Sequence, residues 1–208
     1  MTEHTYEKIY REFGKNLPWC LEGVPKFFKS LIESKWVKPC KTLDMGCGIG
    51  DYANYLALNG FEVLAVDISE TAIDLAKKKY TSTKNLQFKI YDIFKLKDVK
   101  EKYDFVYEIS ILHNIEPKKR AEYIKNICSV LNKGGKLLVC SFSKDDLLFQ
   151  GKESLYFPDL DNTVYPLSEK ELRDLFQEHF KIKRLEKVYF GREGQRQKER
   201  WLCLMEKK

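Results

Sequence analysis

One stretch of ten residues, LDMGCGIGDY at positions 43–52, constrains the fold more than any other part of the chain. Glycines at positions 46, 48 and 50 directly follow an apolar run. Glycine loses more backbone entropy on folding than any other residue, so three of them in one turn need a compensating role. Without side chains in the way, backbone N–H groups can approach a ligand closely. The stretch therefore predicts a strand, a ligand-binding turn and the start of a helix.

Short apolar runs alternate with amphipathic segments along the rest of the chain, which is typical of an α/β fold. Strands are predicted over 41–45, 61–66, 87–91, 104–109, 136–142, 181–189 and 200–206. Helices are predicted over 51–58, 70–80, 117–131 and 169–179, and in much of the first 40 residues. Five strands joined by helices imply parallel pairing. The last two, joined only by GREGQR, predict an antiparallel hairpin. The prediction is a seven-stranded, mostly parallel sheet with a C-terminal antiparallel hairpin and helices on both faces.

The length of 208 residues predicts a single domain over 1–208. Residues 143–166 form a long irregular stretch with two prolines and several aromatic residues, which indicates a substrate-site insertion. Residues 1–40 are expected to form a helical lid. The N-terminal sequence contains acidic residues and lacks an apolar core, so we expect no secretory signal. No run of 18 apolar residues occurs, so no membrane span is expected.

Six cysteines are scattered without a C-x-x-C pair, which predicts no metal site and fits a reducing, cytoplasmic location. The net charge of +6 comes from residues 181–208, which hold ten Lys or Arg and four Asp or Glu. Such a basic segment could contact nucleic acid. It could equally be the solvated face of edge strands, where basic side chains prevent unwanted pairing. We favour the second interpretation.

Acidic residues stand at or near the ends of four predicted strands: Asp44, Asp67, Asp92 and Glu108. Ligands of open α/β sheets bind at the carboxyl ends of the strands, so these acids are expected to share one site. The glycine spacing is G-x-G-x-G rather than the G-x-G-x-x-G of dinucleotide sites. An acid at position 51 would also repel a pyrophosphate. The pattern favours a ligand that carries positive charge and makes a nicotinamide dehydrogenase a poor alternative.

Five segments in order resemble the motifs of class I S-adenosylmethionine-dependent methyltransferases: LDMGCGIG, VLAVDIS, YDIF, YDFVYEISILHNI and LNKGGKLLVCSF. The resemblance implies a Rossmann-like fold and S-adenosylmethionine as the cofactor. It places the backbone of Gly46, Cys47 and Gly48 against the amino acid part and ribose of that cofactor. It places Asp44 near the ammonium group and Asp67 on the ribose hydroxyls.

The same resemblance indicates which residues contact the adenine and which second residue contacts the ammonium. Ile68 is expected under the adenine, while Asp92 accepts from the adenine amino group and Ile93 offers its backbone N–H to the ring. Glu108 is expected to meet the ammonium as well. These acids would complement the ammonium and sulfonium charges of the cofactor.

The N-terminal segment NLPWCLEGVPKFFKSLIE resembles the thiopurine, methyl halide and tellurite-resistance methyltransferase group, with Trp19, Gly23 and Pro25 matching. In that group the segment closes over the cofactor. The ring of Trp19 would favour a sulfonium electrostatically. The alternative is that Trp19 only anchors the segment.

His113, in ILHNI after the fourth strand, is the candidate catalytic residue, either as a general base or as a structural hydrogen-bond partner. The expected function is methyl transfer to a small-molecule acceptor, a thiol or another soft nucleophile, by in-line displacement. The absence of N/D-P-P-F/Y makes a nucleic acid base amine a weaker candidate. A nucleic acid or protein methyltransferase using the basic hairpin, and a non-catalytic S-adenosylmethionine-binding regulator, stay as alternatives. The identity of the acceptor and the oligomeric state are left open.

Overall fold

A central seven-stranded sheet organises the computed structural model, which describes residues 3–21, 23–191 and 194–208. The strand order is β3-β2-β1-β4-β5-β9-β8. The first five strands pair in parallel, and β9 and β8 continue the sheet in antiparallel pairing. This confirms the predicted Rossmann-like sheet with its C-terminal hairpin. The strands are β1 (Lys41–Met45), β2 (Glu62–Asp67), β3 (Leu86–Ile90), β4 (Tyr103–Ile109), β5 (Leu131–Phe142), β8 (Phe180–Phe190) and β9 (Lys198–Lys207).

Helices cover each face of the sheet, as predicted, because the strands of the sheet are apolar on each side. On one face Phe28 and Leu56, from α2 and α3, are fully buried in one core cluster. On the other face Tyr123 and Phe176, from α5 and α6, belong to a second cluster. The helices are α1 (Glu3–Phe13), α2 (Lys26–Glu33), α3 (Asp51–Leu58), α4 (Glu70–Lys79), α5 (Arg120–Val130) and α6 (Glu169–Phe176).

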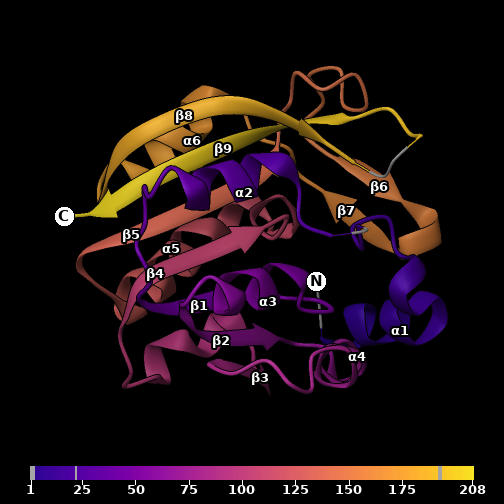
Figure 1. Cartoon of the computed structure of the whole chain (residues 1–208). Helices are drawn as coiled ribbons and strands as arrows, with labels where there is room; N and C mark the ends of the chain where they lie inside the picture. Colours follow the sequence, from indigo (N-terminus) through magenta and orange to yellow (C-terminus); the bar gives the residue numbers. More distant parts are fainter. Residues whose placement is uncertain (1–2, 22, 192–193) are drawn as a thin grey trace.

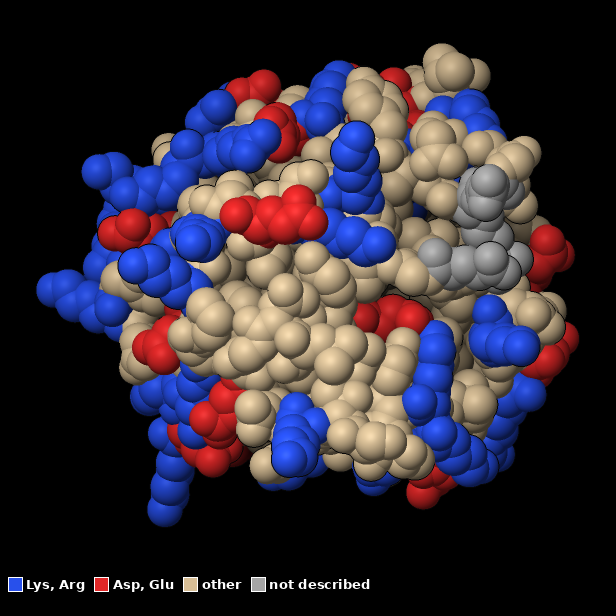
Figure 2. Space-filling view, viewed as in Figure 1, with Lys and Arg blue, Asp and Glu red and all other residues tan. Residues whose placement is uncertain are grey.

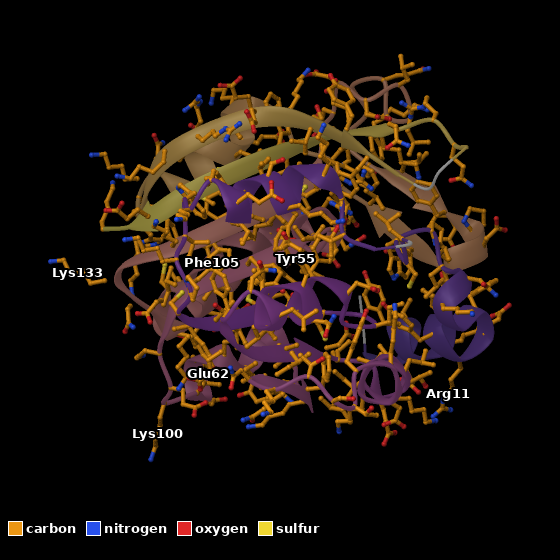
Figure 3. The ribbon with its side chains drawn as sticks, in the orientation of Figure 1. Arg11, Tyr55, Glu62, Lys100, Phe105 and Lys133 are labelled. Carbon is orange, nitrogen blue, oxygen red and sulfur yellow. The ribbon has the colours of Figure 1, made fainter. Side chains whose placement is uncertain are left out.

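The side chains follow the same division between core and surface. Phe105 of β4 is fully buried and is labelled in Figure 3. Lys100 and Lys133 point outward in the same view. None of the helices in the described part of the chain is long and apolar enough to cross a membrane.

Local sequence signals explain where α4 and α6 begin. The hydroxyl of Ser69 accepts the backbone N–H of Ala72 at 3.1 Å, which caps α4. Ser168 and Glu171 form a reciprocal capping box at the start of α6. One predicted boundary is wrong: α5 ends at Val130, close to the predicted end at 131, but β5 begins at Leu131 instead of at 136.

Two chain segments gather beyond the end of the sheet toward which β2 and β4 point (Figure 1). One is α1 with the turn that follows it. The other is the predicted insertion, which forms a small hairpin of β6 (Leu155–Phe157) and β7 (Asn162–Val164). The predicted lid of residues 1–40 also includes α2. That helix packs into the core through Phe28 and Leu31 instead of covering this end of the sheet.

Several basic residues on β8, the outer strand of the hairpin, are paired with acids, as expected for a solvated edge. Lys183 lies 2.9 Å from Glu206, and Lys187 lies 2.9 Å from Glu199. Figure 2 shows acidic side chains interspersed among the basic ones at the upper edge, where β8 runs. The basic residues on β8 therefore do not form a continuous positive surface.

Candidate active site

A cavity of about 600 Å³ opens at the carboxyl ends of β1 to β4, where the strand order reverses between β1 and β4. Ligands bind at this position in open α/β sheets because the loops on its two sides diverge. The turn after β1 and the ends of β2, β3 and β4 form its floor. The N-terminal segment, the insertion and the start of β9 form the walls. All sequence-predicted site residues except Glu108 line this cavity.

The glycines after β1 are required by backbone conformation and by space. Gly46 has φ 70°, and a Cβ atom there would lie 2.2 Å from Cδ1 of Ile111. Gly48 has φ 54°, and a Cβ atom would lie 2.7 Å from the hydroxyl of Tyr10. Both values lie in the left-handed region that side chains other than glycine rarely adopt. Gly50 serves packing, because it has φ 83° and faces the ring of Phe88. The turn thus presents its backbone at positions 46–48 to the cavity.

Asp44 stands in the cavity floor without a counter-ion. It is 3% exposed, and its Oδ2 has no hydrogen-bond partner among the described residues. Burial raises the pKa of this carboxyl to about 8. A buried polar atom without a partner costs free energy unless a ligand satisfies it. Asp44 is therefore suited to a ligand ammonium group.

Asp67 at the end of β2 organises the turn and keeps capacity for a ligand. Its Oδ2 accepts the backbone N–H of Gly48 at 2.8 Å, and its Oδ1 accepts that of Ser69 at 3.0 Å. A carboxylate oxygen has two lone pairs, so each can accept one further hydrogen bond. Two adjacent hydroxyls, such as those of a ribose, match this arrangement.

The end of β3 supplies the third part of the floor. Asp92 accepts the backbone N–H of Phe94 at 2.9 Å through Oδ1, which leaves Oδ2 to a ligand. Ile93 follows in the chain, and Ile68 lies on the neighbouring loop; each lines the cavity. An acceptor beside apolar side chains suits an adenine ring and its amino group. The floor as a whole fits S-adenosylmethionine.

Glu108 does not lie where the predicted ammonium contact would need it. Its side chain is fully buried, and it does not line the cavity within the part of the chain that the structure describes. It accepts the backbone N–H groups of Ile111 at 2.7 Å and Leu112 at 3.3 Å. Glu108 thus holds the loop after β4, where Ser110 adopts φ 73°. Sequence position alone could not separate this role from ligand binding.

The N-terminal segment lies over the cofactor part of the cavity. Trp19 lines it and donates its indole N–H to the hydroxyl of Tyr10 at 3.0 Å. Glu7 attaches α1 to the start of α4 by accepting from the hydroxyls of Ser69 and Thr71, each at 2.7 Å. Partial burial opposes ionisation of Glu7, but hydrogen bonds from Thr71 and Ser69 lower its pKa to about 2.

His113 lines the cavity after β4, on the other side of β1 from Asp92, and its geometry makes it a donor. Its Nδ1 accepts the backbone N–H of Phe142 at 3.1 Å. A backbone N–H can only donate, so the neutral ring carries its proton on Nε2. Burial, with Arg200 and other nearby cations, lowers the pKa of His113 well below its usual range. The predicted alternative of a general base therefore does not fit this geometry.

Several residues around His113 were missed by the sequence analysis. Arg200 and Lys198 of β9 line this end of the cavity, together with Phe142 and Asn162. Asn162 is 5% exposed, and its Oδ1 has no partner among the described residues. Arg200 did leave a signal in the sequence. It lies two residues before Leu202 and therefore on the same, inward face of a buried strand, where an arginine is unusual.

Comparison with known proteins gives the family. The profile of the family described as "Tellurite resistance protein TehB" matches residues 26–189. The chain belongs to this family. The resemblance to the tellurite-resistance methyltransferases seen in the sequence is thereby confirmed.

In the described part of the chain, no group of three or more His, Cys, Asp or Glu residues could hold a metal ion.

Individual relatives differ in how much of the chain they match. The probable S-adenosyl-L-methionine-dependent methyltransferase TehB of Haemophilus influenzae is 34% identical over 116 residues, covering 55% of this chain and 40% of that protein. The chain thus matches less than half the length of that relative. The 2-heptyl-1-hydroxyquinolin-4(1H)-one methyltransferase of Mycobacteroides abscessus is 27% identical over 194 residues, covering 88% of this chain and 80% of that protein.

A solved structure shares the fold across the whole length. It is the 1,6-didemethyltoxoflavin-N1-methyltransferase of Burkholderia thailandensis, with bound 1,6-didemethyltoxoflavin and S-adenosylhomocysteine. It superposes with a TM-score of 0.76 at 19% identity, covering 99% of this chain and 86% of that one. At this identity the likeness establishes the fold alone.

Proposed function

We propose that the chain transfers a methyl group from S-adenosylmethionine to a small acceptor whose nucleophile arrives ionised, a thiolate or a similar soft nucleophile. When bound, the cofactor supplies a methyl group activated by a sulfonium. The acceptor's lone pair would displace this methyl group in line, and the electron pair of the broken carbon–sulfur bond would leave with the sulfur. The relatives named as methyltransferases support the reaction class, and the cavity volume of about 600 Å³ supports a small acceptor.

The observation that carries the soft-nucleophile assignment is the hydrogen bond from Phe142 N–H to Nδ1 of His113. It leaves His113 with a proton on Nε2, so this ring can orient an acceptor but cannot remove its proton. Asp51 and Glu116, which also line the cavity, are ion-paired with Lys79 and Lys118. A thiol needs no strong base because its pKa of about 8.5 leaves a few per cent of it as the reactive thiolate near neutral pH, without help from the protein.

The chain's own residues would then position the reactants and exclude water. We infer that Asp44, Asp67 and Asp92 hold the cofactor and that the described part of the N-terminal segment, through Tyr10 and Trp19, covers it. Insertion residues such as Phe157 would form the wall on the acceptor side. Alignment of the nucleophile with the methyl carbon contributes roughly 7–11 kcal/mol in well-oriented reactions.

Calorimetry and product analysis test this proposal. Titration with S-adenosylmethionine should show binding, and Asp67→Ala should weaken it about tenfold or more, because hydrogen bonds to a charged group contribute about 1.5–3 kcal/mol each. Incubation with a panel of small thiols should yield methylated product by mass spectrometry. Binding without any product would favour the regulator alternative, and steeply salt-dependent RNA binding would favour a nucleic acid substrate.

A further inference from the structure

The acceptor end of the cavity carries positive charge that the protein does not neutralise. Arg196, Lys198 and Arg200 all line it. Arg196 is paired with Asp146, whose Oδ1 lies 2.7 Å from its Nη2. Within the described residues, Lys198 and Arg200 form no ion pair. Two cations therefore face the cavity without a carboxylate of their own.

Arg200 is held rigidly in this position. It is 7% exposed, and its guanidinium carbon lies 4.0 Å from the ring centre of Phe190 and 4.3 Å from that of Phe142. Its Nη1 donates to the backbone carbonyls of Phe190 at 2.8 Å and Lys198 at 3.4 Å. The stacked rings and the two carbonyls fix the plane and direction of the group.

The free edge of Arg200 has the geometry of a carboxylate-binding fork. Nε is buried without a partner among the described residues, and Nη2 likewise donates to none of them. Since Nη1 is the nitrogen on the side of Cδ, the edge left over is the one where Nε–H and Nη2–H point the same way. Two parallel N–H groups bind the two oxygens of a carboxylate.

The energetic cost of this arrangement indicates a ligand. A buried cation without a counter-ion destabilises the fold, and proteins usually pair or replace it. Burial lowers the pKa of Lys198, and the adjacent charge of Arg200 lowers it further. An anion bound here would relieve these repulsions.

We propose that the acceptor is a small organic acid whose carboxylate binds Arg200 through Nε and Nη2, with the ammonium of Lys198 close to the same carboxylate. This proposal rests on the proposed function. The apolar walls distinguish an organic acid from an inorganic oxyanion. Leu148, Phe157 and Leu160 line the cavity and would contact the carbon skeleton. His113, which packs at 4.4 Å between ring centres against Phe142, would donate from Nε2 to the same molecule.

Three probes test this on the wild-type chain saturated with S-adenosylhomocysteine. Benzoate, benzamide and sulfate are titrated by calorimetry or competition. Benzoate should bind about tenfold or more tightly than benzamide, since charged hydrogen bonds add about that much. Equal binding of the two would overturn the carboxylate site. Sulfate binding as tightly as benzoate would overturn the organic scaffold.

Variants assign the effect to Arg200. Arg200→Met should abolish the preference for benzoate over benzamide while leaving benzamide binding near wild type, which a merely structural role would not do. Arg200→Lys keeps the charge without the fork and should retain only part of the preference. Arg184→Met, an exposed arginine of the same hairpin paired with Glu186, should keep the wild-type ratio. A full ratio in Arg200→Met would refute the proposal.

The two proposals fail in different ways. Absence of S-adenosylhomocysteine binding would contradict the proposed function. Normal binding of that compound without any preference for benzoate would contradict only the carboxylate site.

Discussion

Asp44→Asn separates affinity from stability, and the structure gives the expected size of each effect. The substitution keeps the shape of the side chain and removes its charge. If Asp44 binds the cofactor's ammonium, one charge-assisted interaction is lost, which contributes about 1.5–3 kcal/mol. The dissociation constant for S-adenosylmethionine should therefore rise about 10- to 150-fold at pH 8.

The stability of the free protein should change in the opposite direction. Burial raises the pKa of Asp44 to about 8, whereas the unfolded chain ionises near its ordinary value of 3.8. Between these values the folded state holds a proton that the unfolded state has released, so the free energy of unfolding falls as pH rises through this window. The Asn variant lacks this loss. It should equal or exceed wild-type thermal stability at pH 8, and the difference should shrink toward pH 4.

Glu108→Gln is the matched control, because burial raises the pKa of Glu108 to about 8 as well, at the end of a neighbouring strand. Glu108 accepts two backbone N–H groups, and glutamine can accept with only one of its two terminal atoms. This variant should lose stability and keep cofactor affinity close to wild type. Calorimetry measures the cofactor affinity of both variants, and thermal melts at pH 5 and pH 8 measure their stability. Unchanged affinity in Asp44→Asn would refute the ammonium assignment.

Three further outcomes are expected. Gly46→Val should abolish cofactor binding with the sheet intact by circular dichroism, because its Cβ would lie 2.2 Å from Ile111 at φ 70°; normal binding would contradict this. His113→Ala should reduce the methyl-transfer rate about tenfold or less, and the rate of neither the wild type nor the variant should show an inflection near pH 6.5. A 10²–10⁴-fold loss would instead mean general-base catalysis. Glu7→Gln should make the N-terminal segment several times more sensitive to limited proteolysis, and bound S-adenosylmethionine should protect it; equal rates with and without cofactor would argue against a lid.

The sheet and the cofactor floor could be predicted because local sequence determines them. Strand periodicity, the glycine turn and the acids at strand ends each occupy a few consecutive residues. Asp44, Asp67 and Asp92, predicted in this way, all line the cavity, since parallel strands bring their carboxyl ends to one edge. Glu108 shares that signature, and only the fold of the following loop reveals that backbone N–H groups occupy its oxygens.

The acceptor end could not be predicted to the same extent, because it is assembled from distant segments. Phe142, Asn162 and Arg200 meet only after the hairpin and the insertion have packed together. The tautomer of His113 depends on one backbone N–H from a residue 29 positions away. The net charge of the C-terminal segment also hides two groups of basic residues. Those on β8 are largely ion-paired, whereas Lys198 and Arg200 at the start of β9 form no ion pair among the described residues.

The contact between Gly48 and Tyr10 links two parts of the chain that are far apart in sequence. The hydroxyl of Tyr10 occupies the space where a side chain at position 48 would begin. A larger residue at 48 would therefore displace the cover before it met the cofactor; a smaller residue at 10 would relieve this clash, although the backbone strain at φ 54° would persist. Natural variation at these two positions should be correlated, and an engineer who wishes to alter one should redesign the other in the same step.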